Sequence, residues 1–234
     1  TAVLSGIETS ASRACTADNL GWVNVSVNDA NNNNDLDAGD SMSISFSNCA
    51  ISNTERINGS MSILVNSISD SYYSAVDFSM NLNNFSVVSG NTTSFATGDM
   101  RLSMQEYATY TNYSIGINSL ASSATVSGVT KSFSMSGFSM ALKDALTAND
   151  EQTYSGTLAM SHFNNQSVGI STTSPWLISN GASYPYTGQM LLTGQSGSKI
   201  RITAISSSNV KLELDAAGDG VYEETKVLTW ASMP

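Results

Sequence analysis

Hydrophobic and small polar residues alternate along much of the chain, and a glycine opens the clearest of these alternating stretches. Four of them occur at residues 59–65 (GSMSILV), 98–104 (GDMRLSM), 156–160 (GTLAM) and 188–192 (GQMLL). Successive side chains of a β-strand point to opposite faces of a sheet. The pattern therefore predicts strands with one apolar face and one polar face.

Similar alternation predicts further strands between these stretches. They cover residues 22–27, 41–46, 76–82, 113–117, 133–142, 168–170, 199–205, 210–214 and 221–230. Because turn residues separate them regularly and no linker-like segment occurs, we predict a single all-β domain over residues 1–234. The expected architecture is a large antiparallel meander sheet that forms a sandwich or partly closed barrel. Residues 3–14 fit either helical or strand spacing, and residues 1–14 are a candidate docking or donor segment.

Charge is scarce in this chain and mostly negative. Charged residues make up 12% of the 234 residues, and the formal net charge is −10 with only nine lysines and arginines. Such a surface disfavours nucleic acid and anionic membranes as partners and favours divalent cations. No run of about 18 apolar residues is present to form a transmembrane helix. Residues 1–4 (TAVL) lack the features of a signal peptide, so we expect the mature terminus of an exported protein.

Two cysteines, Cys15 and Cys49, flank the first predicted hairpin. A disulfide between them would stabilise the fold by roughly 3–4 kcal/mol through loop closure. We predict this disulfide, and with it an oxidising compartment. The alternative is a pair of free buried thiols in a cytosolic protein.

The polar loop of the first hairpin is a candidate calcium site. Carboxylate and amide side chains occupy the first, third, fifth, seventh, ninth and twelfth positions of an EF-hand-like loop. These residues are Asp29, Asn31, Asn33, Asp35, Asp37 and Asp40. Asn34 replaces the turn glycine of that motif, and Asp40 replaces its longer glutamate. The alternative interpretation is a solvated hairpin loop without metal.

Other residues of catalytic or metal-binding type lack a supporting context. A second acidic turn at residues 215–224 (DAAGDGVYEE) has Ala217 where a calcium loop needs a carboxylate, which favours a plain turn. His162 is the single histidine, and no Gly-x-Ser-x-Gly motif accompanies it. One histidine and two cysteines without ligand spacing also disfavour a zinc site. We therefore predict that the protein is not an enzyme.

Several short segments resemble uncharacterised secreted or lipoprotein-type β-rich proteins of Gram-negative bacteria. They are residues 184–190 (YPYTGQM), 193–199 (TGQSGSK) and 214–223 (LDAAGDGVYE), together with 38–41 (AGDS) and 48–49 (NC) in the first hairpin. The resemblance covers about a third of the chain. It implies an exported β-protein and implies no particular activity.

These features favour a protein that works by contact. We predict an extracellular, non-catalytic structural subunit that polymerises into a filament or surface assembly by strand exchange, with further copies or another cell-surface component as partner. Val3, Leu4 and Ile7 are the candidate assembly residues, because an apolar segment can add a strand to an open sheet edge. The alternative is a periplasmic binding protein that holds a lipid or other hydrophobic ligand in a methionine-lined cleft.

Overall fold

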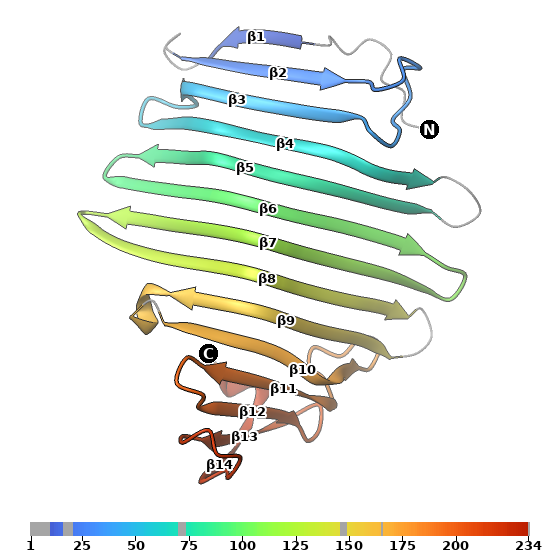
Figure 1. The fold of residues 1–234 in the computed structure, drawn as a ribbon, viewed down its shortest axis with the longest axis vertical. Helices are drawn as coiled ribbons and strands as arrows, with labels where there is room; N and C mark the ends of the chain where they lie inside the picture. The colour runs from blue at the N-terminus through green and yellow to red at the C-terminus, as the bar shows by residue number, and fades with distance from the viewer. Residues whose placement is uncertain (1–9, 16–20, 70–73, 146–148, 165, 234) are drawn as a thin grey trace. The chain divides into compact units, whose positions relative to one another are not determined.

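The fold is an antiparallel meander in which every strand lies beside its neighbours in the chain. The computed structural model describes residues 10–15, 21–69, 74–145, 149–164 and 166–233. Fourteen strands form one sheet in the order of the sequence, from β1 to β14 (Figure 1). The prediction of an all-β chain with a large antiparallel meander sheet is confirmed. The sheet is not closed, because β1 and β14 have no pairing with one another in the described residues.

The strands differ in length, and those in the middle of the order are the longest. They are β1 (Ser10–Ala14), β2 (Trp22–Asn28), β3 (Ser41–Ala50), β4 (Glu55–Ser69), β5 (Ala75–Ser89), β6 (Thr92–Glu106), β7 (Tyr110–Val126), β8 (Val129–Ala145), β9 (Asp150–Met160), β10 (Ser167–Ile178), β11 (Thr187–Gly194), β12 (Lys199–Ala204), β13 (Asn209–Asp215) and β14 (Glu224–Thr229). Two 3-10 turns complete the set, η1 (Ser161–Phe163) and η2 (Trp230–Ser232). Within the described residues, no helix has the length and hydropathy that crossing a membrane requires.

The chain divides into two compact units. The first comprises Thr1–Met104 and Ile117–Ser134, and the second comprises Gln105–Gly116 and Met135–Pro234. The division cuts through β6, β7 and β8 and does not coincide with a linker segment. The expectation of a single domain stays a prediction.

In the first unit, the register of β2–β5 gathers the apolar side chains of the alternating pattern on one face. Val25 lies opposite Ile44, Ile44 opposite Met61, and Met61 opposite Leu82. Side chains that lie opposite one another in an antiparallel pair share a face. We call this surface the apolar face; its residues are Val23, Val25, Val27, Met42, Ile44, Phe46, Met61, Ile63, Val65, Phe78, Met80 and Leu82.

The apolar face is only half-buried. Val65 is its one buried residue, with 4% of its surface exposed, and the other eleven residues are half-buried. On the opposite face, serines alternate with them, and Ser43 and Ser62 are exposed. The buried apolar residues of this unit are therefore few and lie apart. Cys15, Cys49 and Ala50 are buried at one end of the β3–β4 pair, Val65 is buried at its other end, and Ile117 is buried on β7.

The second unit has its buried residues in its last strands. Val210 and Asp215 are fully buried, and Trp176 is 5% exposed. The rings of Trp176 and Trp230 meet edge to face at 5.7 Å between centroids, and Tyr184 stacks on Trp230 at 6.0 Å. Trp230 also donates its indole N–H to the Ser206 carbonyl oxygen at 3.1 Å. The Trp176–Trp230 contact thus packs η2 against β10.

The glycines at the start of the alternating stretches lie where the backbones of neighbouring strands approach closely. Gly59 has φ +98°, and Gly98 has φ +149°. A Cβ at Gly98 would lie 2.1 Å from the Ser119 carbonyl oxygen on β7. In β4, the pairing with β5 shifts by one residue at Gly59, which marks a β-bulge. Glycine is needed at both positions, because a side chain would collide with the adjacent backbone.

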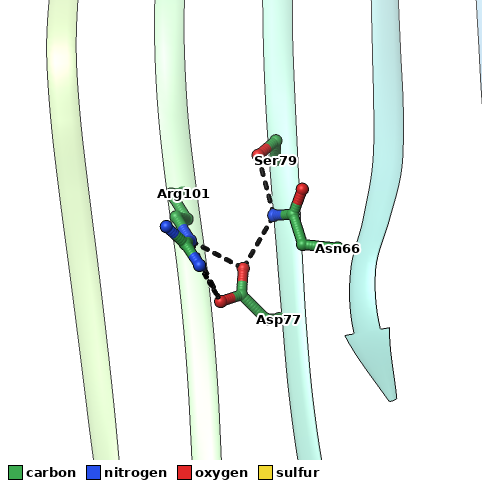
Figure 2. A network of polar contacts seen from close by, with 4 residues as sticks. All are labelled: Asn66, Asp77, Ser79 and Arg101. Atoms are coloured by element: carbon green, nitrogen blue, oxygen red, sulfur yellow. Dashed lines mark hydrogen bonds and ion pairs between the residues drawn. The ribbon is translucent and has the colours of Figure 1, made fainter. Parts of the chain in front are cut away.

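The polar face of the first unit carries a hydrogen-bonded network across three strands (Figure 2). Arg101 on β6 donates from Nε to both carboxylate oxygens of Asp77 on β5, at 2.8 and 3.0 Å. Asn66 on β4 donates to the same carboxylate at 2.7 Å and to the Ser79 hydroxyl at 2.8 Å. The hydrogen bonds from Arg101 lower the pKa of Asp77, with a further contribution from Asn66. The network links β4, β5 and β6 through their side chains.

The first testable prediction concerns Gly98. We expect Gly98→Ala to destabilise the protein by more than about 1 kcal/mol, because the new Cβ collides with backbone at a positive φ. A loss of that size lowers the Tm by at least about 2–4 °C in a chain of this length. Gly116→Ala is the matched control, since no atom lies within 4 Å of its Cβ position and its φ is not positive. Thermal denaturation followed by circular dichroism measures both, and equal Tm values for the two variants would contradict the close-approach argument.

The second prediction concerns the pH dependence of the Asp77 network. The pKa of Asp77 is lower in the folded protein than in the unfolded chain, so the ionised carboxylate stabilises the fold. This stabilisation is complete above the unfolded-state pKa and is lost as the pH falls through the folded-state pKa. Arg101 has 64% of its side chain exposed, so we expect Asp77→Asn to destabilise the protein less than Gly98→Ala does. The stability difference between wild type and Asp77→Asn should shrink with acidification in urea titrations. If the stability difference between the two proteins stays constant with pH, the charge of Asp77 does not contribute to stability.

Candidate functional site

The predicted calcium loop is the connection between β2 and β3. It begins after Asn28 and ends before Ser41, so all six predicted ligand residues lie in one hairpin loop of the first unit. Asn32 and Asn34 adopt φ of +57° and +63°. Asn34 thus takes the left-handed conformation at the position where an EF-hand loop has glycine.

The first half of the loop is curled by hydrogen bonds from side-chain oxygens to nearby backbone amides. The carboxylate of Asp29 accepts the N–H groups of Asn31 at 3.2 Å and Asn34 at 2.7 Å. Asn31 accepts the N–H of Asn33 at 3.1 Å, and Asn33 accepts that of Asp35 at 2.7 Å. Short carboxylate and amide side chains favour such local bonds, which is why the sequence forms a tight loop here.

Asp40 closes the loop and ties it to the sheet. It is 1% exposed, and its two carboxylate oxygens accept the N–H groups of Ala30 at 2.8 Å and Asp37 at 2.7 Å. The backbone carbonyl of Asp40 also accepts the Val65 N–H at 2.8 Å, and Gly39 donates its N–H to the Val65 carbonyl at 2.8 Å. A buried carboxylate needs such partners, and Asp40 finds them within its own loop.

Asp37 is the point where the side chains of the loop converge. Its Oδ2 accepts the amide N–H groups of Asn31, at 2.9 Å, and of Asn33. These two hydrogen bonds lower the pKa of Asp37, with the bond from Asn31 having the larger effect. The amide nitrogens of the two asparagines therefore occupy positions beside Asp37 that a cation would compete for.

The loop has oxygen atoms that could hold a hard cation, but several of them already accept hydrogen bonds from other groups of the same loop. The candidate ligands are the carboxylates of Asp29, Asp35 and Asp37, which are half-buried, whereas Asp40 is buried. Both carboxylate oxygens of Asp29, like those of Asp40, also accept backbone amides. Among the described residues, three carboxylates converge within 4.8 Å at Asp215, Asp219 and Glu223 and not in this loop. Binding in the predicted loop would require the Asn31 and Asn33 amides to leave Asp37.

The second acidic turn connects β13 and β14 and is organised around Asp215. This carboxylate is fully buried, and it accepts the N–H groups of Gly218 at 2.6 Å, Asp219 at 3.1 Å and Gly220 at 2.9 Å. Lys199 lies 4.0 Å away on β12. Sequence reasoning favoured a plain turn here because of Ala217. The structure shows that Glu223, from the far side of the turn, approaches the carboxylates that the sequence left separate.

A charged cluster beside this turn was not found from the sequence. Arg201 on β12 donates to the Glu213 carboxylate at 2.8 Å, and Lys211 lies 3.2 Å from the same carboxylate. The hydrogen bond from Arg201 lowers the pKa of Glu213, and the bond from Lys211 adds to this effect. The Arg201 guanidinium also lies over the Tyr222 ring, 4.0 Å from its centroid. Residues 201 and 213 are cross-strand partners, a relation that appears only once the register is known.

The predicted pairing of the cysteines is confirmed. Cys15 and Cys49 form a disulfide, with 5.3 Å between their Cα atoms. The bond joins the residue after β1 to the end of β3, where both cysteines are at most 5% exposed and the neighbouring Ala50 is 1% exposed. A disulfide at this place indicates an oxidising environment.

The other predicted residues lie in different parts of the chain. Val3, Leu4 and Ile7, the candidate assembly residues, lie outside the described residues; of the segment 1–14, Ser10–Ala14 forms β1. His162 is exposed in η1. Apart from the predicted residues, Tyr107 stacks on Tyr110 at 4.4 Å in the second unit, and the Lys143 ammonium lies 4.5 Å from the centre of the Tyr110 ring.

Comparisons with protein families, curated proteins and solved structures found no match to this chain. The resemblance of the short segments 184–190, 193–199, 214–223, 38–41 and 48–49 to exported β-rich proteins therefore stays a prediction.

Proposed function

We propose that this protein is an exported, non-catalytic structural subunit that assembles with further copies of itself at the edges of its sheet. The observation that carries the proposal is the strand order. In the described residues, β1 pairs only with β2, and β14 pairs only with β13. Each end strand thus presents a row of unpaired backbone N–H and C=O groups, which is a template for another strand.

The two edges belong to different strands, and this supports open-ended assembly. When the β1 side of one copy meets the β14 side of the next, the contact is head to tail, and such contacts build rings or filaments. The apolar segment before β1 would strengthen the contact by supplying a donor strand to the neighbouring copy. The extracellular space or cell surface is the site that we propose for such an assembly, with the periplasm as the alternative.

The disulfide supports this proposal through its position. Cys15 follows β1 directly and is bonded to Cys49 on β3. The edge strand is short, with five residues, and the covalent link holds its end against the sheet. An edge that is fixed in this way can accept or align a neighbouring strand without fraying.

A second candidate function is the binding of a lipid or another hydrophobic ligand in the periplasm. The observation that favours it is the half-buried apolar face, which contains Met42, Met61 and Met80. Methionine adapts its shape to different apolar partners. Under this alternative, the purified protein would consist of monomers that carry lipid.

We further propose that calcium binds the loop of residues 29–40. The left-handed conformation of Asn34 and the curl around Asp29 support this proposal. On binding, the oxygen atoms of Asp29, Asp35 and Asp37 would ligate the ion, and the asparagine amides would turn away from Asp37. Hard, oxygen-rich sites of this kind suit calcium.

Edge assembly predicts that Val227→Lys abolishes fibres. Val227 is 58% exposed on the edge strand β14, which already carries Lys226. A second lysine beside Lys226 adds to the charge on the edge and opposes its pairing with another sheet. Val129→Lys is the matched control, because Val129 is 64% exposed on β8, which has a neighbour on both sides. Deletion of residues 1–9 should also prevent fibre formation while leaving β1 and Cys15 in place. Negative-stain microscopy measures the outcome, and uniform wild-type monomers would contradict the proposal.

The calcium proposal predicts that Ca²⁺ raises the Tm and that EGTA reverses the effect, because a ligand of the folded state stabilises it. Asp29→Asn, which retains the size of the side chain, should remove most of the shift. Asp219→Asn is the control, since it changes the other acidic turn. Equal Tm values in Ca²⁺ and EGTA would contradict calcium binding, and loss of the shift in Asp219→Asn alone would place the ion at the second turn.

A further inference from the structure

The two edge strands carry exposed charges that edge assembly has to accommodate. β1 contains Arg13, and β14 contains Glu224 and Lys226. Among the described residues, no ion pair includes any of these three side chains. Charges on an edge strand oppose pairing with an arbitrary sheet. A strand that pairs with either edge must therefore match the charges on it.

The hydrogen bonds between β1 and β2 show which backbone groups of β1 point outward. Cys15 donates its N–H to the Gly21 carbonyl oxygen at 3.2 Å, and these two residues continue the register of the β1–β2 pair. In an antiparallel pair, every second residue bonds to the same neighbouring strand. Counted back from Cys15, the residues that bond to β2 alternate with Ser10, Ser12 and Ala14. The N–H and C=O groups of these three residues therefore point away from β2.

The same reasoning identifies the outward groups of β14. Trp230 donates its N–H to the Ser208 carbonyl oxygen at 3.0 Å, in the register of the β13–β14 pair. The N–H and C=O groups of Thr225, Val227 and Thr229 therefore point away from β13. An antiparallel strand that joins this edge must form its backbone hydrogen bonds with these three residues.

We propose that β14 of one copy binds β1 of the next copy in a single antiparallel register, in which Arg13 lies opposite Glu224. This inference rests on the edge assembly proposed above and names the residues that select the partner strand. In this register, Ser12 lies opposite Thr225, so the outward backbone groups of both strands meet. Arg13 and Glu224 then form a non-hydrogen-bonded pair, in which opposite side chains lie closest together.

The faces of the two strands support this register. Arg13 lies opposite Val23 of the apolar face, and Glu224 lies opposite Leu214 on β13. Residues that lie opposite one another share a face. The ion pair between the copies would thus lie in one row between Val23 and Leu214. Apolar neighbours on both sides exclude water from the pair, so solvent screens it less than an isolated surface pair.

A shift of two residues keeps the backbone match and reverses the charge match. Arg13 would then lie opposite Lys226, and like charges that lie directly opposite destabilise a strand pair. This shifted register would pair all five residues of β1 with β14, one pair more than the proposed register. Strand overlap alone thus favours the shifted register, and the charges favour the proposed one.

Disulfide cross-linking between copies can measure the register. Opposite residues of a hydrogen-bonded pair have Cα atoms about 5.5 Å apart, which a disulfide can span. Fibres of Ser12→Cys/Thr225→Cys should oxidise to a covalent ladder on a non-reducing gel, because each copy has a cysteine at both edges. Ser12→Cys/Val227→Cys reports the shifted register. It is the matched control and should cross-link at least about fivefold more slowly.

Charge reversal should switch the register. With Arg13→Glu, like charges meet at Glu224 in the proposed register and opposite charges meet at Lys226 in the shifted one. The order of the two cross-linking rates should therefore reverse in this background. Glu224→Lys leaves Arg13 opposite a lysine in either register, so it should raise the critical concentration for fibres at least about fivefold.

Glu106→Lys is the control for Glu224→Lys. It changes the net charge equally, and Glu106 is exposed on β6, which has a neighbour on both sides. We expect this variant to leave the critical concentration at or below the wild-type value. Circular dichroism checks that all variants fold.

The register and edge assembly fail in different experiments. Fibres that cross-link equally with both cysteine pairs, or whose order of rates survives Arg13→Glu, would overturn the register and leave edge assembly standing. Rapid dimer formation by Ser12→Cys alone would show that β1 pairs with β1 and would also overturn the register. Uniform wild-type monomers in negative-stain microscopy would contradict both proposals. If the cysteine variants form no fibres, equal critical concentrations for Glu224→Lys and Glu106→Lys would overturn the register.

Discussion

The alternation of side chains along each β-strand is the constraint on which the rest of this structure depends. It gives the strands with alternating sequences an apolar side and a polar side, and the register of β2–β5 places the apolar sides together. The backbone hydrogen bonds lie within the sheet, so they do not determine what packs against that apolar face. In the described residues, the face stays half-buried, with Val65 as its one buried member. This apolar surface supports the proposal of a protein that works by contact.

The sequence predicted those parts of the fold that follow from local pattern. The strand from Gly59, its partner from Val76 and the Cys15–Cys49 bond were all accessible, because alternation and cysteine spacing are visible along the chain. The far half of β7 was not, since residues 118–126 (NSLASSATV) lack a clear period of two. Its serines and threonines are paired into the sheet by the neighbouring strands, and Thr125 and Thr130 share a hydrogen bond across the β7–β8 hairpin. The length of β7 is therefore set by its pairing with the neighbouring strands, which cannot be seen in the sequence of this segment alone.

The candidate sites likewise contain features that follow from the spacing of residues in the sequence and features that depend on the folded structure. The loop of residues 29–40 could be proposed because its ligand-type residues follow one another at fixed spacing, and the curl around Asp29 follows from the same spacing. The convergence of the Asn31 and Asn33 amides on Asp37 was not predictable, because it depends on which end of each amide faces the carboxylate. The Asp77 network and the Arg201–Glu213 pair depend on cross-strand register. The approach of Glu223 to Asp215 depends on how the chain leaves the second acidic turn.

Edges and face offer two kinds of association that obey different physics. An open edge binds through directional backbone hydrogen bonds, which fix the register of the incoming strand, whereas an apolar face binds in proportion to the area it removes from water. Association at the edges must overcome the repulsion between copies that each carry a net charge of −10. The densest carboxylates lie in two hairpin loops, between β2 and β3 and between β13 and β14, away from the centres of the strands. Much of the negative charge is thus concentrated in loops that cations can reach, although the edge strand β14 also carries Glu224. A cation held in either loop would lower the repulsion between copies, so the calcium proposal and the assembly proposal are linked through the electrostatics of the whole chain.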